Sequence, residues 1–199
     1  MTEVKFFLYG SLTEGLVHFE RIRDFIVDQK EASIKAKAYR LKVGFPVLLK
    51  EGEDSVPGAV VTVKSPDLLI HLLDEFHGFR PQEPQKSLYF KELVEVTDVN
   101  GQTDVGYTYF LNPKHLPSSA SLIVGGDWKR ALGSAPLFTA TLTDRQKHYI
   151  NKLGKVSGRE IIPIDLPLYR ELMNLEIIVD KGRRLALSKF GNEVFRYLN

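Results

Sequence analysis

Short apolar segments bounded by turn residues fill the first 111 residues of the chain. Runs of aliphatic and aromatic residues broken by glycine, proline or polar turns are typical of buried β-strands. The segments with this pattern are residues 4–9, 32–41, 46–49, 57–63, 88–96 and 105–111. We therefore expect a β core of about six or seven strands, for which a closed or nearly closed barrel is the natural way to bury strands so apolar.

Two segments of the same region have helical spacing. Apolar residues recur at this spacing between the start signal Pro66-Asp67 and Gly78, which tolerates positive φ and can end a helix, so a helix is predicted over 66–78. The spacing of apolar residues over 19–26 predicts a second helix. The polar segment 51–54 is expected to be a turn between two strands.

From Leu142 onward the pattern is mainly helical. Thr143 can cap a helix that runs to Leu153, and further helices are expected over 168–175 and 188–198, with a short hairpin over 177–187. Helix, hairpin and helix in this order resemble the second half of a winged helix. The expected fold is α+β: a small mixed β-barrel with flanking helices over 1–130, and a helical, winged-helix-like subdomain over 141–199.

Composition excludes several classes of site. The chain has no cysteine, so disulfides, thiolate metal sites and cysteine nucleophiles are ruled out, which agrees with a cytoplasmic location. There is no secretory signal pattern and no stretch of roughly 20 apolar residues that would span a membrane. The histidines have no metal-ligand spacing, and no dinucleotide or phosphate-loop motif is present, so we expect no metal and no cofactor.

Charge gives only a weak indication of nucleic-acid binding. The net charge is +2, and the segment from residue 141 carries eleven basic against seven acidic residues. Lys181, Arg183 and Arg184 could form a basic wing tip, but the helix over 168–175 offers only Arg170 as a cation for reading bases. We therefore expect no nucleic-acid partner, and expect this segment to pack against the barrel or to pair two chains as a homodimer.

Two places carry candidate site residues. Glu75 and His77 fall in the last turn of the predicted helix, where the helix dipole favours a histidine cation and places its pKa close to working pH. The break after the first strand, Tyr9-Gly10-Ser11-Leu12, exposes backbone N–H groups that suit a carboxylate or phosphate, although a plain turn explains it equally. Ser11 lacks a nucleophile motif, and its neighbours suggest no histidine partner.

Six short motifs occur in order over residues 4–130. They are Tyr9-Gly10-Ser11-Leu12, Gly44-Phe45-Pro46, the strand start Pro57-Gly58, Leu73-Asp74-x-x-x-Gly78, Tyr89-x-Lys91-x-x-Val94-x-Val96 and Gly125-x-Asp127-Trp128. In order and spacing this set resembles the gamma-glutamylcyclotransferase-like family, which includes the avirulence-induced-gene-like proteins. The segment from about residue 141 lies outside the resemblance.

The resemblance implies a barrel in which a γ-glutamyl amine or peptide cyclises to 5-oxoproline and releases the amine, without a metal. It implies that the backbone of Tyr9, Gly10, Ser11 and Leu12 binds the substrate carboxylate and that a glutamate just before Gly78 is the base. Here that position is His77, and Lys91 stands where arginine is common. A neutral imidazole can accept the same proton, and Glu75 is the other candidate, although residues two apart on a helix do not share a face.

Three functions are therefore open. The first is an enzyme that cyclises a γ-glutamyl compound with His77 or Glu75 in proton transfer. The second is a regulatory module whose barrel binds a small carboxylate without turnover. The third is DNA binding through the C-terminal segment.

Overall fold

The computed structural model describes residues 3–156, 160–182 and 184–198. Contacts divide the chain into two compact units, which are Met1–Leu41 with Phe45–Ser134, and Lys42–Gly44 with Ala135–Asn199. The predicted wing-tip residue Arg183 lies outside the described residues.

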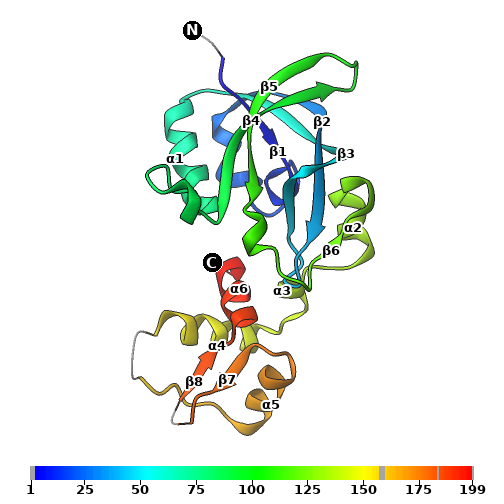
Figure 1. The fold of residues 1–199 in the computed structure, drawn as a ribbon. Coiled ribbons are helices and arrows are strands. Elements are labelled where there is room, and N and C mark those ends of the chain that lie inside the picture. Colours follow the sequence, from blue (N-terminus) through cyan, green and yellow to red (C-terminus); the bar gives the residue numbers. More distant parts are fainter. Residues whose placement is uncertain (1–2, 157–159, 183, 199) are drawn as a thin grey trace. The chain divides into compact units, whose positions relative to one another are not determined.

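The first unit contains a closed, five-stranded mixed barrel, as predicted (Figure 1). Its strand order is β3-β1-β5-β4-β2, and β2 pairs back to β3 to close it. The pairing of β1 with β5 is parallel, whereas the other pairings in the barrel are antiparallel. The strands are β1 (Lys5–Leu8), β2 (Ile26–Arg40), β3 (Pro46–Val63), β4 (Tyr89–Asp98) and β5 (Thr103–Leu111), and the short β6 (Ser121–Leu122) adds to the outer side of β2.

Two sequence predictions in this unit are wrong. The predicted helix over 19–26 is replaced by two 3₁₀ turns, Phe19–Arg21 and Arg23–Phe25, after which β2 begins at Ile26. The predicted turn over 51–54 lies inside the single long strand β3. The register there jumps between Ala36 and Lys37 of β2, so the polar segment is accommodated as an irregularity in a continuous hairpin.

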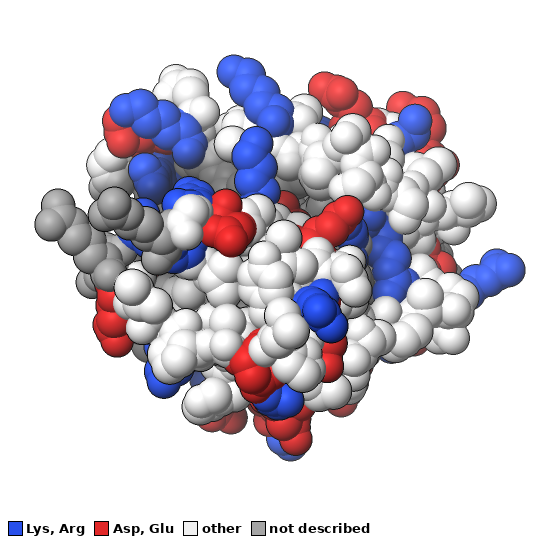
Figure 2. Space-filling view, turned by 90° about the horizontal axis from the view of Figure 1, so that it is seen from below, with Lys and Arg blue, Asp and Glu red and all other residues white. Residues whose placement is uncertain are grey.

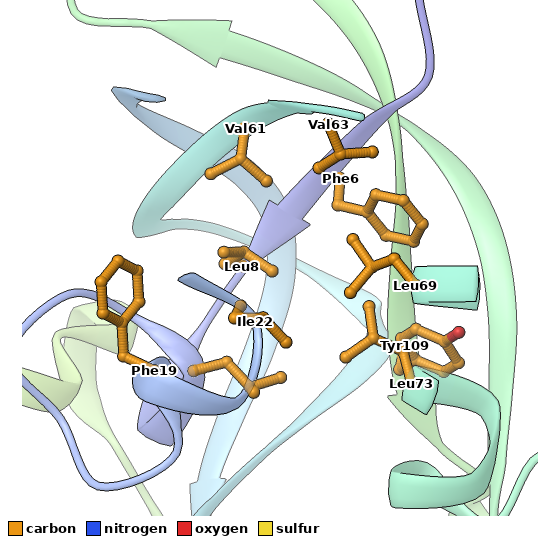
Figure 3. Packing of buried hydrophobic residues seen from close by; sticks show 10 residues of the cluster. Phe6, Leu8, Phe19, Ile22, Val61, Val63, Leu69, Leu73 and Tyr109 are labelled. Carbon is orange, nitrogen blue, oxygen red and sulfur yellow. The ribbon is translucent and has the colours of Figure 1, made fainter. Parts of the chain in front are cut away.

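Helix α1 (Pro66–His77) confirms the predicted helix and its end signal. Gly78 adopts φ 63°, and the N–H of Phe79 donates to the carbonyl of Asp74 at 2.8 Å, which completes a glycine cap. Leu69 and Leu73 face inward from α1 and pack against side chains of β1 and β3 (Figure 3). This packing fixes the C-terminal end of α1 against the barrel. The remaining helix of this unit is α2 (Trp128–Ser134).

The second unit contains the predicted helices and hairpin in the predicted order, preceded by the short helix α3, which was not predicted. The elements are α3 (Phe138–Thr141), α4 (Asp144–Lys155), α5 (Leu166–Asn174), the hairpin of β7 (Ile178–Asp180) and β8 (Leu185–Leu187), and α6 (Lys189–Leu198). Thr143 and Gln146 form a capping box at the start of α4. Assignment of these elements to the winged-helix class stays a prediction.

The distribution of surface charge and the length of the helices bear on possible partners. Basic and acidic side chains are interspersed among uncharged residues over the face drawn in Figure 2. In the part of the chain that the structure describes, no helix combines the length and apolar character needed to cross a bilayer.

Candidate functional site

His77 lies in the last turn of α1 against an aromatic wall. Its Nδ1 is 2.9 Å from the carbonyl oxygen of Leu73, and because a carbonyl only accepts, Nδ1 carries the proton. The imidazole is stacked on the ring of Tyr109, with centroids 4.0 Å apart and planes 2° from parallel. The rings of Phe76 and Tyr89 contact it edge-on, at 5.0 and 5.1 Å. The ring is therefore held in one orientation.

Burial lowers the pKa of His77 to about 4, although the hydrogen bond to Leu73 and the charge of Asp74 act in the opposite direction. The prediction that the helix dipole would hold this pKa near working pH is therefore wrong, because desolvation outweighs the dipole. At neutral pH the imidazole is uncharged, with its lone pair on Nε2. No fully buried side-chain nitrogen or oxygen among the described residues lacks a partner, and no hydrogen bond from Nε2 to them is found, so Nε2 is not fully buried.

Glu75, the other predicted proton-transfer residue, is exposed. It lies two residues before His77 on the same helix, and residues two apart point in different directions. The structure therefore brings His77, and not Glu75, to the aromatic wall.

A buried charge network supports this wall from behind. The carboxylate of Asp74 accepts hydrogen bonds from the hydroxyl of Tyr109 at 2.6 Å and from Nζ of Lys91 at 2.9 Å. Asp74 is only 8% exposed, so these two donors replace the water that the carboxylate loses on folding. Since Tyr109 is the ring on which His77 stacks, Asp74 also fixes the position of the imidazole. Sequence reasoning placed Tyr109 in the barrel but missed this link.

The segment Tyr9–Leu12 forms a tight turn at the end of β1. Gly10 has φ 64° and begins the 3₁₀ turn Gly10–Leu12, and a Cβ at this position would lie 2.5 Å from Cγ of Pro46. The N–H groups of Gly10 and Ser11 lie at the start of this turn, where backbone donors have no intrahelical acceptor. Leu12 is buried in the core. Binding of a substrate carboxylate by the backbone of Tyr9, Gly10, Ser11 and Leu12 stays a prediction.

Ser11 has a histidine partner, contrary to the prediction. Nδ1 of His18 is 2.8 Å from Oγ of Ser11, and the backbone N–H of His18 donates to the carbonyl of Ser11 at 2.9 Å. Burial, and then the charge of Arg21, lower the pKa of His18 to about 4, so this imidazole is also neutral at pH 7. Its ring contacts Phe76 edge-on at 5.0 Å, and Phe76 contacts His77 in the same way, so one side chain separates the two histidines.

A cavity of about 480 Å³ adjoins the same turn. Tyr9 and Gly10 line it, and the hydroxyl of Tyr9 donates to the carbonyl of Gly126 at 2.8 Å. Burial, and then the charge of Asp127, raise the pKa of Tyr9. Ser11, His18 and His77 are not part of its lining, which includes four carboxylates (Glu14, Glu31, Asp98 and Asp127) and one lysine (Lys129). This charge balance disfavours an anion in the cavity.

Chemically, the groups gathered around His77 suit proton transfer. No set of three or more histidine, aspartate or glutamate side chains within the described ranges is arranged as a metal site. The site instead offers a neutral imidazole with an open nitrogen, a hydroxyl bonded to a second imidazole, and two backbone N–H groups at the start of a turn.

The first unit is a closed mixed barrel with a glycine turn after its first strand and a helix that ends in a fixed histidine. These features define an α+β barrel protein with a candidate proton-transfer site. The family model for gamma-glutamyl cyclotransferase, AIG2-like proteins matches residues 6–130. The chain therefore belongs to this family.

Comparison with solved structures finds similarity at low sequence identity. YkqA from Bacillus subtilis is 18% identical, with a TM-score of 0.50, over 94% of this chain and 81% of its own. A mouse AIG2-like protein is 18% identical, with a TM-score of 0.44, over 59% of this chain and 86% of its own. A structure described as gamma-glutamyl cyclotransferase is 16% identical, with a TM-score of 0.41, over 87% of this chain and 99% of its own. Comparison with curated proteins finds no significant match.

Proposed function

We propose that this protein cyclises a γ-glutamyl amine or peptide to 5-oxoproline and releases the amine, with His77 as the base. The observation that carries the proposal is the unprotonated Nε2, not fully buried, of a fixed imidazole at the end of α1. His77 occupies the position at which the family pattern has a glutamate, and the chain belongs to that family over residues 6–130.

The reaction transfers one acyl group within the substrate. The α-ammonium loses a proton to Nε2 of His77, and the free amine attacks the γ-carbonyl carbon. A new C–N bond closes the five-membered ring, and the ring nitrogen gives up a second proton as the original amide C–N bond breaks. The leaving amine takes this proton and the one held by the imidazolium, and departs as an ammonium ion. No water is consumed, and His77 returns to its starting state.

The pKa of His77 makes it chemically reasonable for a histidine to replace the glutamate of the family pattern as the base. A pKa of about 4 is close to the ordinary value of a glutamate side chain, roughly 4.3, so the two groups have a similar proton affinity. They differ in charge, because the imidazole that accepts the proton is neutral whereas a carboxylate is negative. We therefore expect His77 to transfer the proton but to attract the substrate ammonium only weakly.

The substrate carboxylate would bind to the backbone donors of Gly10 and Ser11. These N–H groups have no acceptor within the turn, and the residues belong to the segment that the resemblance assigns to the substrate. The acidic cavity beside Tyr9 is the less favourable place for a carboxylate, because like charges repel.

One observation favours a second function, that of a small-carboxylate-binding module. A neutral group at position 77 removes the negative charge that would hold an ammonium beside it, so ligands could bind without turnover. This function predicts that glutamate or 5-oxoproline raises the melting temperature while no product forms.

The direct test is incubation of the purified protein with γ-glutamyl-alanine, glutathione and γ-glutamyl-methylamide, followed by quantification of 5-oxoproline. The enzyme function predicts 5-oxoproline and free amine in equal amounts from at least one compound. Absence of product from all three, together with stabilisation by glutamate, would instead support the binding module.

A further inference from the structure

His18 holds Ser11 at two points, once through its side chain and once through its backbone N–H. His18 donates its backbone N–H to the carbonyl of Ser11, and its Nδ1 lies 2.8 Å from the hydroxyl. The segment between the two residues is thereby closed into a loop whose first member is the serine of the predicted substrate turn. A plain turn does not require the second contact, which acts only on the hydroxyl.

The histidine is itself fixed. It is only 7% exposed, its ring stacks on Phe45 with centroids 5.7 Å apart, and the edge of Phe76 contacts it at 5.0 Å. No hydrogen bond from Nε2 of His18 to a described residue is found and, because no fully buried polar side-chain atom of the described chain lacks a partner, Nε2 is not fully buried. His18 thus has one nitrogen committed to Ser11 and one open.

The same aromatic side chain connects this pair to the proposed base. Phe76 contacts both imidazoles, each at 5.0 Å between centroids. Phe76 therefore contacts both the imidazole that bonds to Ser11 and the imidazole of the proposed base.

We propose that His18 is a positioning residue that holds the Ser11 hydroxyl in place as a contact for the γ-glutamyl group. The inference rests on the proposed function, because it takes the turn at Gly10 and Ser11 as the place where the substrate binds. His18 acts through Ser11 and does not itself touch the reacting atoms.

A double-mutant cycle tests this inference through kcat and KM for 5-oxoproline release. Ser11→Ala removes the hydroxyl, and His18→Phe keeps an aromatic ring against Phe45 and Phe76 but removes Nδ1. Each variant should lower kcat/KM about 5- to 10-fold, as expected for one hydrogen bond. The double variant should be no worse than either single variant, because both remove the same interaction.

A rescue variant distinguishes a positioning role of His18 from a role in folding. His18→Asn places an amide nitrogen near the position of Nδ1 and should return kcat/KM to within about threefold of the wild type. Ser118→Ala, at an exposed serine outside the site, should leave activity unchanged. Additive losses in the double variant, or full activity of His18→Phe, would overturn the inference.

The double-mutant cycle can also be measured by ligand binding if the protein does not turn over its substrate. If the wild type releases no 5-oxoproline but binds L-glutamate in calorimetry, the same cycle is measured in Kd. Non-additive losses of affinity would then support the role of His18 while the proposed reaction fails. If the wild type neither turns over nor binds, both proposals are overturned.

Discussion

The two buried histidines should make the barrel sensitive to mild acid. His18 and His77 both have a pKa near 4 in the folded protein, against 6.5 as the ordinary value. Because the folded state binds fewer protons than the unfolded chain, their contribution to the free energy of unfolding is complete above pH 6.5 and is lost as the pH falls toward 4. A shift of this size corresponds to about 3 kcal/mol for each residue, of which about 2 kcal/mol is already lost at pH 5.

Urea unfolding at pH 7 and pH 5 measures this loss. Trp128 is the only tryptophan and is 4% exposed, so its fluorescence reports unfolding of the unit that contains both histidines. The wild type should lose about 4 kcal/mol between the two pH values, and His77→Gln should lose only about 2 kcal/mol. His71→Gln, at an exposed histidine on the same helix, is the matched control and should behave as the wild type.

Acidic side chains also protonate near pH 5, so the difference between variants is more informative than the total loss. The reasoning would be refuted if His77→Gln lost as much stability as the wild type. It would also be refuted if the NMR signal of the His77 ring titrated close to pH 6.5.

Other substitutions test the packing around the site. Lys91→Met should destabilise the protein by about 3 kcal/mol, because it leaves the buried Asp74 carboxylate without its cation. Tyr109→Phe removes one hydrogen bond from the same carboxylate but keeps the ring, and should cost about 2 kcal/mol; urea unfolding measures both. In the second unit, Gly191→Ala would place a Cβ 2.0 Å from a backbone carbonyl oxygen and should lower the melting temperature sharply. Gly133→Ala in α2 of the first unit, where a Cβ meets nothing within 4 Å, should not.

The elements that sequence reasoning predicted best carry their signals locally. Helix α1 has apolar spacing, a proline at its start and Gly78 at its end within one short segment, and the structure confirms it. The capping box of Thr143 and Gln146 is local in the same way, and the structure places a helix directly after it. The closed barrel could be predicted because the sequence indicates many apolar strands, and a closed barrel buries such strands better than an open sheet does.

The errors concern features that depend on distant partners. The polar segment over 51–54 is typical of a turn, but it lies inside β3, where the residues on both sides of it pair with β2 across a register shift. The pKa of His77 depends on burial against Tyr89 of β4 and Tyr109 of β5, which helix position alone does not reveal. The Ser11–His18 contact requires a turn that the sequence suggested only as a glycine break.

The central claim is that His77 carries the proton in a γ-glutamyl cyclisation. Its most direct test is the rate of 5-oxoproline release by the wild type, His77→Ala, His77→Glu and Glu75→Ala at pH 7, each first checked for folding by Trp128 fluorescence. The account predicts that His77→Ala loses activity by at least about 100-fold, which is typical of a lost general base, that Glu75→Ala is unaffected, and that His77→Glu equals or exceeds the wild type. Undiminished release by His77→Ala would contradict it.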